Sequence, residues 1–158
     1  MASKSRCDVG DPAGFFADLV RCETRLYNAL NDRLRDRHGI VTSQFEFLSF
    51  LREHPGARVA DLATEFAVGI GATSKGVDRL AKQGWVLRQP NPSDRRSSLL
   101  TLTEDGMRLV EAARNTYTER LAELLDAILV GSPFAAAAQV LSQLRATLER
   151  DQIGMPAG

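Results

Sequence analysis

The segment from Val59 to Thr103 constrains the fold of this chain more than any other part of its sequence. Apolar spacing predicts a short helix over Val59–Phe66, a tight turn, and a longer helix over Ile70–Gln83. Two strand candidates follow: Trp85–Arg88, which is apolar, and Ser98–Thr103, which is rich in Leu and Thr. This order predicts a winged helix-turn-helix, whose second helix fits a DNA major groove and whose hairpin can reach an adjacent minor groove.

The polar tip of the predicted hairpin, Gln89–Arg96, joins the two strand candidates. Its two prolines favour a turn that holds the adjacent Arg95 and Arg96 in water. Two arginines at a hairpin tip are usually just solvated turn residues. Next to a helix-turn-helix, however, they lie where they could reach a DNA groove. We expect Asp94 to orient an arginine, and Arg95 or Arg96 to enter a narrow A/T-rich minor groove.

The distribution of charge supports the same interpretation. The chain has a formal net charge of zero, and residues 1–54 contain 8 Lys/Arg and 8 Asp/Glu. Residues 55–102 contain 7 Lys/Arg against 4 Asp/Glu, whereas residues 103–158 contain 5 against 8. The positive surplus is therefore confined to the predicted winged lobe. Displacing phosphate counterions requires such local positive potential, not a basic chain.

The polar side chains of the longer helix are the candidates for DNA contact. Thr73, Ser74 and Lys75 lie in its N-terminal part, where they could reach base edges. Arg79 and Lys82 lie further along and are expected to contact phosphates. Because Asn, Gln and Arg are missing from the front of this helix, we expect modest base readout and a contribution from DNA shape.

Several of these residues have the spacing of a known family. Asp94-Arg95-Arg96, followed by Leu100-Thr101-Leu102-Thr103 and Gly106, resembles the wing signature of the MarR family of multiple antibiotic resistance regulators. Upstream residues at the family's spacing are Leu62-Ala63, Val77-Asp78-Arg79-Leu80, Gly84 and Arg88. The resemblance covers roughly residues 15–148. It implies a homodimer on a pseudo-palindromic operator, usually a repressor, often released by a small aromatic or phenolic ligand or by oxidation.

The chain departs from the family pattern in its recognition helix. Alignment with the family places Gly69 at the N-cap, where Ser is usual, and Gly71 and Gly76 inside the helix. Each glycine within a helix costs about 1 kcal/mol relative to alanine. We therefore expect a recognition helix that is weak in isolation.

The remaining helices are predicted from capping signals and apolar spacing. A first helix starts at Asp11-Pro12 and ends near Arg37, with Gly39 as C-cap. A second covers Gln44–Glu53, capped by Thr42 or Ser43 with Glu46 as the returning acid. A long helix begins after Thr103 and is broken at Gly131-Ser132-Pro133, after which a last helix follows.

These helices carry more apolar surface than a winged lobe can cover, which predicts an intertwined helical homodimer. The fold class is thus mainly α with a small β-hairpin wing. Residues 1–10 are expected to form a disordered tail, residues 11–54 and 103–152 a helical dimerisation region, and residues 55–102 the DNA-binding lobe. A long apolar segment and a signal peptide are both missing from the sequence, so we expect a cytoplasmic, nucleoid-associated protein without membrane contact.

A ligand cleft is expected between the helical dimer and the DNA-binding lobe. Its predicted lining residues are Arg21, Arg25, Tyr27, Phe45, Leu48 and Trp85. An anionic aromatic effector could pair with one of the arginines and stack on phenylalanine. The alternative is that Phe45, Phe47 and Phe50 line no ligand site and pack into the core, because their helix is buried on two sides.

Other functions find less support in the sequence. A phosphate-binding glycine loop, a nucleophile elbow and a metal-ligand spacing are all missing, so we expect neither an enzyme nor a bound cofactor or metal. One alternative is a redox-responsive regulator that acts through Cys22, although this residue lies on the apolar stripe of its helix, where a packed cysteine is expected. The other is a winged-helix module that binds protein.

Overall fold

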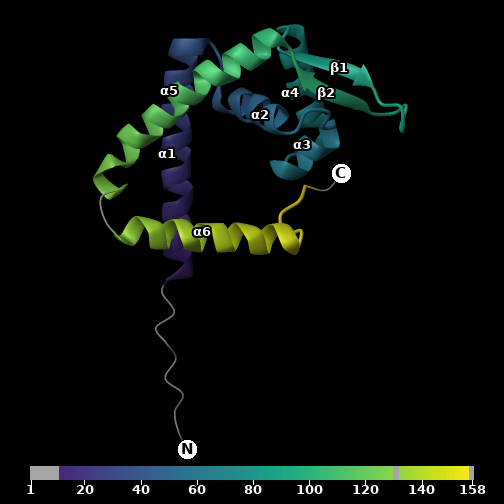
Figure 1. The fold of residues 1–158 in the computed structure, drawn as a ribbon. Helices are drawn as coiled ribbons and strands as arrows, with labels where there is room; N and C mark the ends of the chain where they lie inside the picture. The colour runs from purple at the N-terminus through teal and green to yellow at the C-terminus, as the bar shows by residue number, and fades with distance from the viewer. Residues whose placement is uncertain (1–10, 130–131, 157–158) are drawn as a thin grey trace, which may run out of the picture.

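The computed structural model describes residues 11–129 and 132–156 (Figure 1). In chain order its elements are α1 (Pro12–His38), α2 (Thr42–Glu53), α3 (Val59–Glu65), α4 (Ile70–Lys82), β1 (Val86–Pro90), β2 (Ser98–Leu102), α5 (Glu104–Leu129) and α6 (Ser132–Arg150). The helices α2 to α4 and the hairpin form a lobe at one end, and α1 and α5 extend away from it (Figure 1). The helix α6 crosses the N-terminal part of α1 and runs back toward α3. The prediction of a mainly helical chain with a winged helix-turn-helix is confirmed.

The boundaries of α1 follow from its capping residues. The Asp11 carboxylate accepts a hydrogen bond from the Ala13 N–H at 3.1 Å, and Pro12 occupies the first helical position. At the other end Gly39 adopts the left-handed conformation, with φ of 68°, and its N–H donates to the Arg35 carbonyl. Both predicted caps of this helix are confirmed.

The predicted cap of α2 is wrong. Thr42 and Ser43 lie inside the helix, and Val41 is the N-cap. The Gln44 side chain accepts from the Val41 N–H at 3.0 Å, while the Thr42 N–H donates to Asn31 of α1 at 2.7 Å. Because Gln44 and Asn31 already satisfy these N–H groups, no Ser or Thr cap is required.

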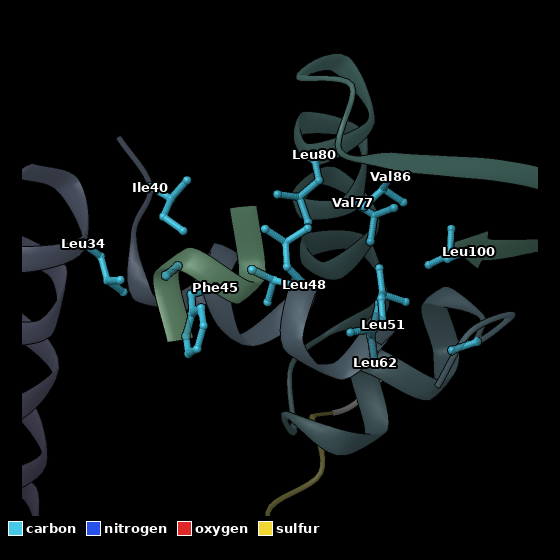
Figure 2. Packing of buried hydrophobic residues seen from close by; sticks show 13 residues of the cluster. Leu34, Ile40, Phe45, Leu48, Leu51, Leu62, Val77, Leu80, Val86 and Leu100 are labelled. Atoms are coloured by element: carbon cyan, nitrogen blue, oxygen red, sulfur yellow. The ribbon is translucent and has the colours of Figure 1, made fainter. Parts of the chain in front are cut away.

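The helix α2 lies at the centre of the hydrophobic core (Figure 2). Its Leu48 and Leu51 are fully buried and pack among residues of α3, α4 and the hairpin. The core also includes Leu34, Ile40, Phe45, Ala57, Leu62, Val77, Leu80, Val86, Leu100, Val110 and Ala113. A single core therefore joins the winged lobe to α1 and α5.

The hairpin pairs Val86 with Leu102 at its base and Pro90 with Ser98 at its far end. The prediction that Gln89 and Pro90 belong to the turn is therefore wrong, since both continue β1. Proline is tolerated there because it closes the last pair of a two-stranded ladder, where its missing N–H breaks no interior bond. On its other edge β2 is bridged to Ala57, whose carbonyl accepts from the Leu100 N–H at 2.8 Å.

Thr103 connects the hairpin to α5. Its hydroxyl accepts from the Gly106 N–H at 3.0 Å, as expected of an N-cap, and also donates to the Gly84 carbonyl at 2.7 Å. Its own N–H donates to the Trp85 carbonyl at 3.0 Å. The end of α4, the base of the wing and the start of α5 are thereby fixed together.

The predicted tail at residues 1–10 lies outside the described residues, and so does Gly131 of the predicted helix break. On either side of Gly131, α5 ends at Leu129 and α6 begins at Ser132. Within residues 11–129 and 132–156, no helix is long and apolar enough to cross a membrane.

A matched pair of glycine substitutions tests the junction at Thr103. A Cβ on Gly106 would collide with the Trp85 carbonyl, whereas one on Gly71 meets nothing within 4 Å. We predict that Gly106→Ala lowers the free energy of unfolding by about 1–3 kcal/mol through overpacking. Gly71→Ala should raise it by up to about 1 kcal/mol through helix propensity. Urea denaturation measures both, and equal effects of the two substitutions would contradict the proposed packing.

Candidate nucleic-acid interface

The exposed face of α4 carries three basic residues. Lys75, Arg79 and Lys82 are exposed along the helix, and Ser74 is half-buried. The expectation of an exposed Thr73 is wrong, because this residue is fully buried and its hydroxyl donates to the Gly69 carbonyl at 3.1 Å. The reason is helical periodicity, which places Thr73 on the same face as the buried Val77 and Leu80.

The hairpin is tied to α4 by an ion pair. The guanidinium of Arg88 on β1 donates to the Asp78 carboxylate at 2.7 Å and to the Ser74 carbonyl at 3.5 Å. The pair holds the wing at a fixed position relative to α4. Arg88 and Asp78 both occur at the spacing of the family, but the sequence does not predict that they pair, because their proximity depends on how the hairpin folds back.

The wing tip is organised by short polar side chains. Asn91 donates from its amide to the Ser97 hydroxyl at 2.8 Å, and the Asp94 carboxylate accepts from the Arg96 backbone N–H at 2.9 Å. Asp94, which we expect to orient an arginine, acts on the backbone of Arg96 and so fixes the part of the turn that carries this arginine. Arg95 and Arg96 are exposed, and within the described part of the chain neither forms an ion pair.

Arg58, at the start of α3, adds a further exposed basic group to this lobe. Its guanidinium donates to Asp61 at 2.8 Å, a bond that raises the pKa of Arg58, and the charge of Asp94 on the wing acts in the same direction. Arg58 therefore lies close enough to the wing for its charge to interact with that of Asp94. In the sequence Arg58 is only one of the seven basic residues of segment 55–102, and no local motif singles it out.

The six predicted ligand-binding residues do not gather in one place. Phe45 and Leu48 are buried in the core, where Phe45 stacks on Tyr117 with ring centroids 4.7 Å apart. Trp85 packs against the same core from the base of the hairpin. Arg21 and Arg25 are exposed on α1.

Tyr27 is the one of the six that lines the cavity between α1, α2 and α4, whose volume is about 480 Å³. Its hydroxyl donates to the Glu46 carboxylate at 3.1 Å. Burial raises the pKa of Glu46, and the charge of Glu23 adds to this, while the Tyr27 hydrogen bond lowers it. Within the described residues no group of three or more His, Cys, Asp or Glu is arranged to hold a metal.

A second apolar region spans the N-terminal part of α1 and one face of α6. Phe15 and Phe16 are 51% and 64% exposed, and Val140 of α6 is 53% exposed. The large side chains of Leu141, Leu144 and Leu148 are also exposed. Cys22 borders this region and is exposed, so the expectation of a packed cysteine is wrong for the single chain.

A family model, related sequences and solved structures all show similarity to MarR-type regulators. The family model described as "MarR family" matches residues 41–98. The multiple antibiotic resistance protein MarR of Salmonella typhimurium is 28% identical over 82% of this chain and 94% of its own length. The transcriptional regulator PecS of Dickeya dadantii is 27% identical over 89% of this chain and 81% of its own length.

Solved structures of regulators share the fold. A mutant of MarR from E. coli complexed with operator DNA matches with a TM-score of 0.70 and 26% identity, covering 85% of this chain and 97% of that one. Sco3205 of Streptomyces coelicolor, in complex with DNA, matches with a TM-score of 0.82 and 20% identity over 98% of both chains, which shows the fold. The winged helix-turn-helix with its basic tip is thus similar, in sequence and in fold, to transcriptional regulators of the MarR family, whose family model matches residues 41–98.

Proposed function

We propose that this protein binds double-stranded operator DNA through α4 and the wing. The observation that carries the proposal is the set of exposed basic side chains on these two elements, with the free guanidinium groups of Arg95 and Arg96 at the wing tip. The similarity to a MarR structure that contains operator DNA supports it. A gel-shift assay with the DNA upstream of the protein's own gene tests it, and DNA without the site serves as competitor.

The polar and basic residues of α4 and the wing tip have separate roles in the proposed complex. Ser74 and Lys75 approach base edges from the N-terminal part of α4, and Arg79 and Lys82 contact phosphates. Arg95 or Arg96 enters the adjacent minor groove, where the negative potential of a narrow A/T-rich groove attracts arginine. Thr73 is excluded from base contact by its burial. With few base-reading side chains on α4, much of the specificity comes from the wing and from DNA shape.

A homodimer is the proposed binding species. The exposed apolar side chains of α1 and α6 are large and lie together, which is unusual for a monomer in water. Covering them with the same surface of a second copy gives a two-fold symmetric pair. Such a pair presents two copies of α4 to half-sites about 34–36 Å apart on a pseudo-palindromic operator.

The dimer is proposed to act as a repressor that a small aromatic ligand releases. A ligand releases DNA only if it binds more tightly to a dimer whose two α4 helices have the wrong spacing. The family resemblance supports both repression and ligand control. The cavity against α4 offers a place for such a ligand.

The wing arginines give the first prediction for this function. Arg95→Ala and Arg96→Ala should each lower operator affinity about five- to tenfold at fixed salt, because one groove contact is lost. The slope of log affinity against log salt should also fall by about 1, because the lost guanidinium no longer displaces a counterion from the DNA. Arg37→Ala is the matched control, since it removes an exposed arginine from α1. Wild-type affinity in both wing variants would refute the assignment.

The apolar face of α6 gives a second prediction. Val140→Asp should shift the protein from dimer to monomer in sedimentation velocity, since a charge would be buried without a partner. Ala146→Asp makes a comparable change on the opposite face of α6 and should leave the dimer intact. Gel-shift affinity should fall with the dimer in the first variant alone. A Val140→Asp protein that remains dimeric would contradict this interface.

A further inference from the structure

We propose that the cavity between α1, α2 and α4 binds a small aromatic cation, of the aryl-alkylamine class, and that this compound is the effector. The inference rests on the proposed function, because it assigns a chemical class to the ligand that releases DNA. The sequence alone suggested an anionic aromatic held by an arginine of α1. The residues that the fold brings together point to the opposite charge.

The size and walls of the cavity suit an aromatic ring. Its volume of about 480 Å³ lies in the range of small-molecule sites and accommodates a bicyclic compound. Phe47 and Phe66 line it, with ring centroids 5.3 Å apart, and both are half-buried. Val68 and Leu80 add aliphatic surface. A flat apolar ligand would replace water along these walls.

The polar groups of the cavity are mainly acidic. Glu23 and Glu46 both line it, and across the described residues neither forms an ion pair with Lys, Arg or His. The Tyr27 hydroxyl donates to one oxygen of Glu46, which leaves the other oxygen available to an ammonium donor. Burial raises the pKa of Glu46, so this carboxylate lacks the cation that would stabilise its charge.

An anionic ligand would be repelled here. Arg79 is the one basic residue among those that line the cavity, and its side chain is exposed to water. Arg21 and Arg25 do not line the cavity at all. A carboxylate placed between Glu23 and Glu46 would thus face two like charges with one solvated guanidinium to offset them. An ammonium group in the same position gains two partners.

The cavity is connected to the recognition helix through Phe47. Ala72, Gly76 and Arg79 of α4 form part of its wall. The Phe47 ring lies so close to Gly76 that a Cβ at this position would be 2.9 Å from the ring atom Cε2. A ligand that displaces Phe47 therefore presses on α4 at a glycine. Because interiors are close-packed, a small shift there changes the position of the helix that carries Lys75 and Lys82.

Three indole compounds of similar shape test the charge preference. Tryptamine is cationic, tryptophol is neutral, and indole-3-propionate is anionic, with the same ring and a two-carbon spacer. Isothermal titration calorimetry on the full chain should give the tightest binding for tryptamine and the weakest for indole-3-propionate. Glu46→Gln should lower tryptamine affinity about tenfold and leave tryptophol unchanged, because the charged hydrogen bond is lost. Glu119→Gln, an exposed acid on α5 outside the cavity, is the matched control.

The remaining outcomes separate this inference from DNA binding. Glu23→Gln, an exposed position on α1, replaces Glu46→Gln if thermal denaturation shows that the latter does not fold. In gel shifts tryptamine should release the operator from wild-type protein and less from either variant. Binding of none of the three indoles, tighter binding of indole-3-propionate, or wild-type tryptamine affinity in the variants overturns the inference. A protein that binds tryptamine but no operator contradicts the proposed function instead.

Discussion

Burial of α2 is the interaction on which the rest of the structure depends. Leu48 and Leu51 fill the space between α3, α4 and the hairpin, and Phe45 of the same helix stacks on Tyr117 of α5. One short helix thereby joins α3, α4 and the hairpin to the long helices. Fully burying a side chain of this size contributes about 1.5–3 kcal/mol, so the lobe cannot rotate freely about α2. In the proposed dimer, a change in the spacing of the two α4 helices would therefore pass through this packing.

The base of the wing is positioned by the burial of Val86 and Leu100, and its outer part by polar contacts. Four of the five residues of β1 are exposed, so most of this strand adds nothing to the core. The Arg88–Asp78 pair fixes it to α4, Leu100 bridges to Ala57, and Thr103 fixes its base to α5. This arrangement keeps the arginines of the tip at a set distance from α4 while the tip itself stays in water. A rigid base with a solvated tip suits the proposed entry of an arginine into a DNA minor groove, because the tip must be exposed and held at a fixed position.

The proposed ligand site shows how the two halves of the molecule can communicate. Glu46 lies on α2, one residue from Phe47, and Phe47 lies against Gly76 of the recognition helix. Gly76, one of the glycines that weaken α4 as a helix, lies so close to the Phe47 ring that a Cβ would not fit without a shift. This glycine lowers the helix propensity of α4, and in the structure it forms part of the cavity wall.

The sequence by itself determined the order and type of the elements, the caps of α1, the N-cap of α5 and the confinement of positive charge to residues 55–102. These follow from local signals, since capping, periodicity and turn residues act within a few positions. Tertiary structure alone decided that Thr73 faces the core, that Arg88 reaches Asp78, and that Tyr27 meets Glu46. Such contacts depend on the angle at which elements pack, and side chains far apart in sequence compete to fill one space.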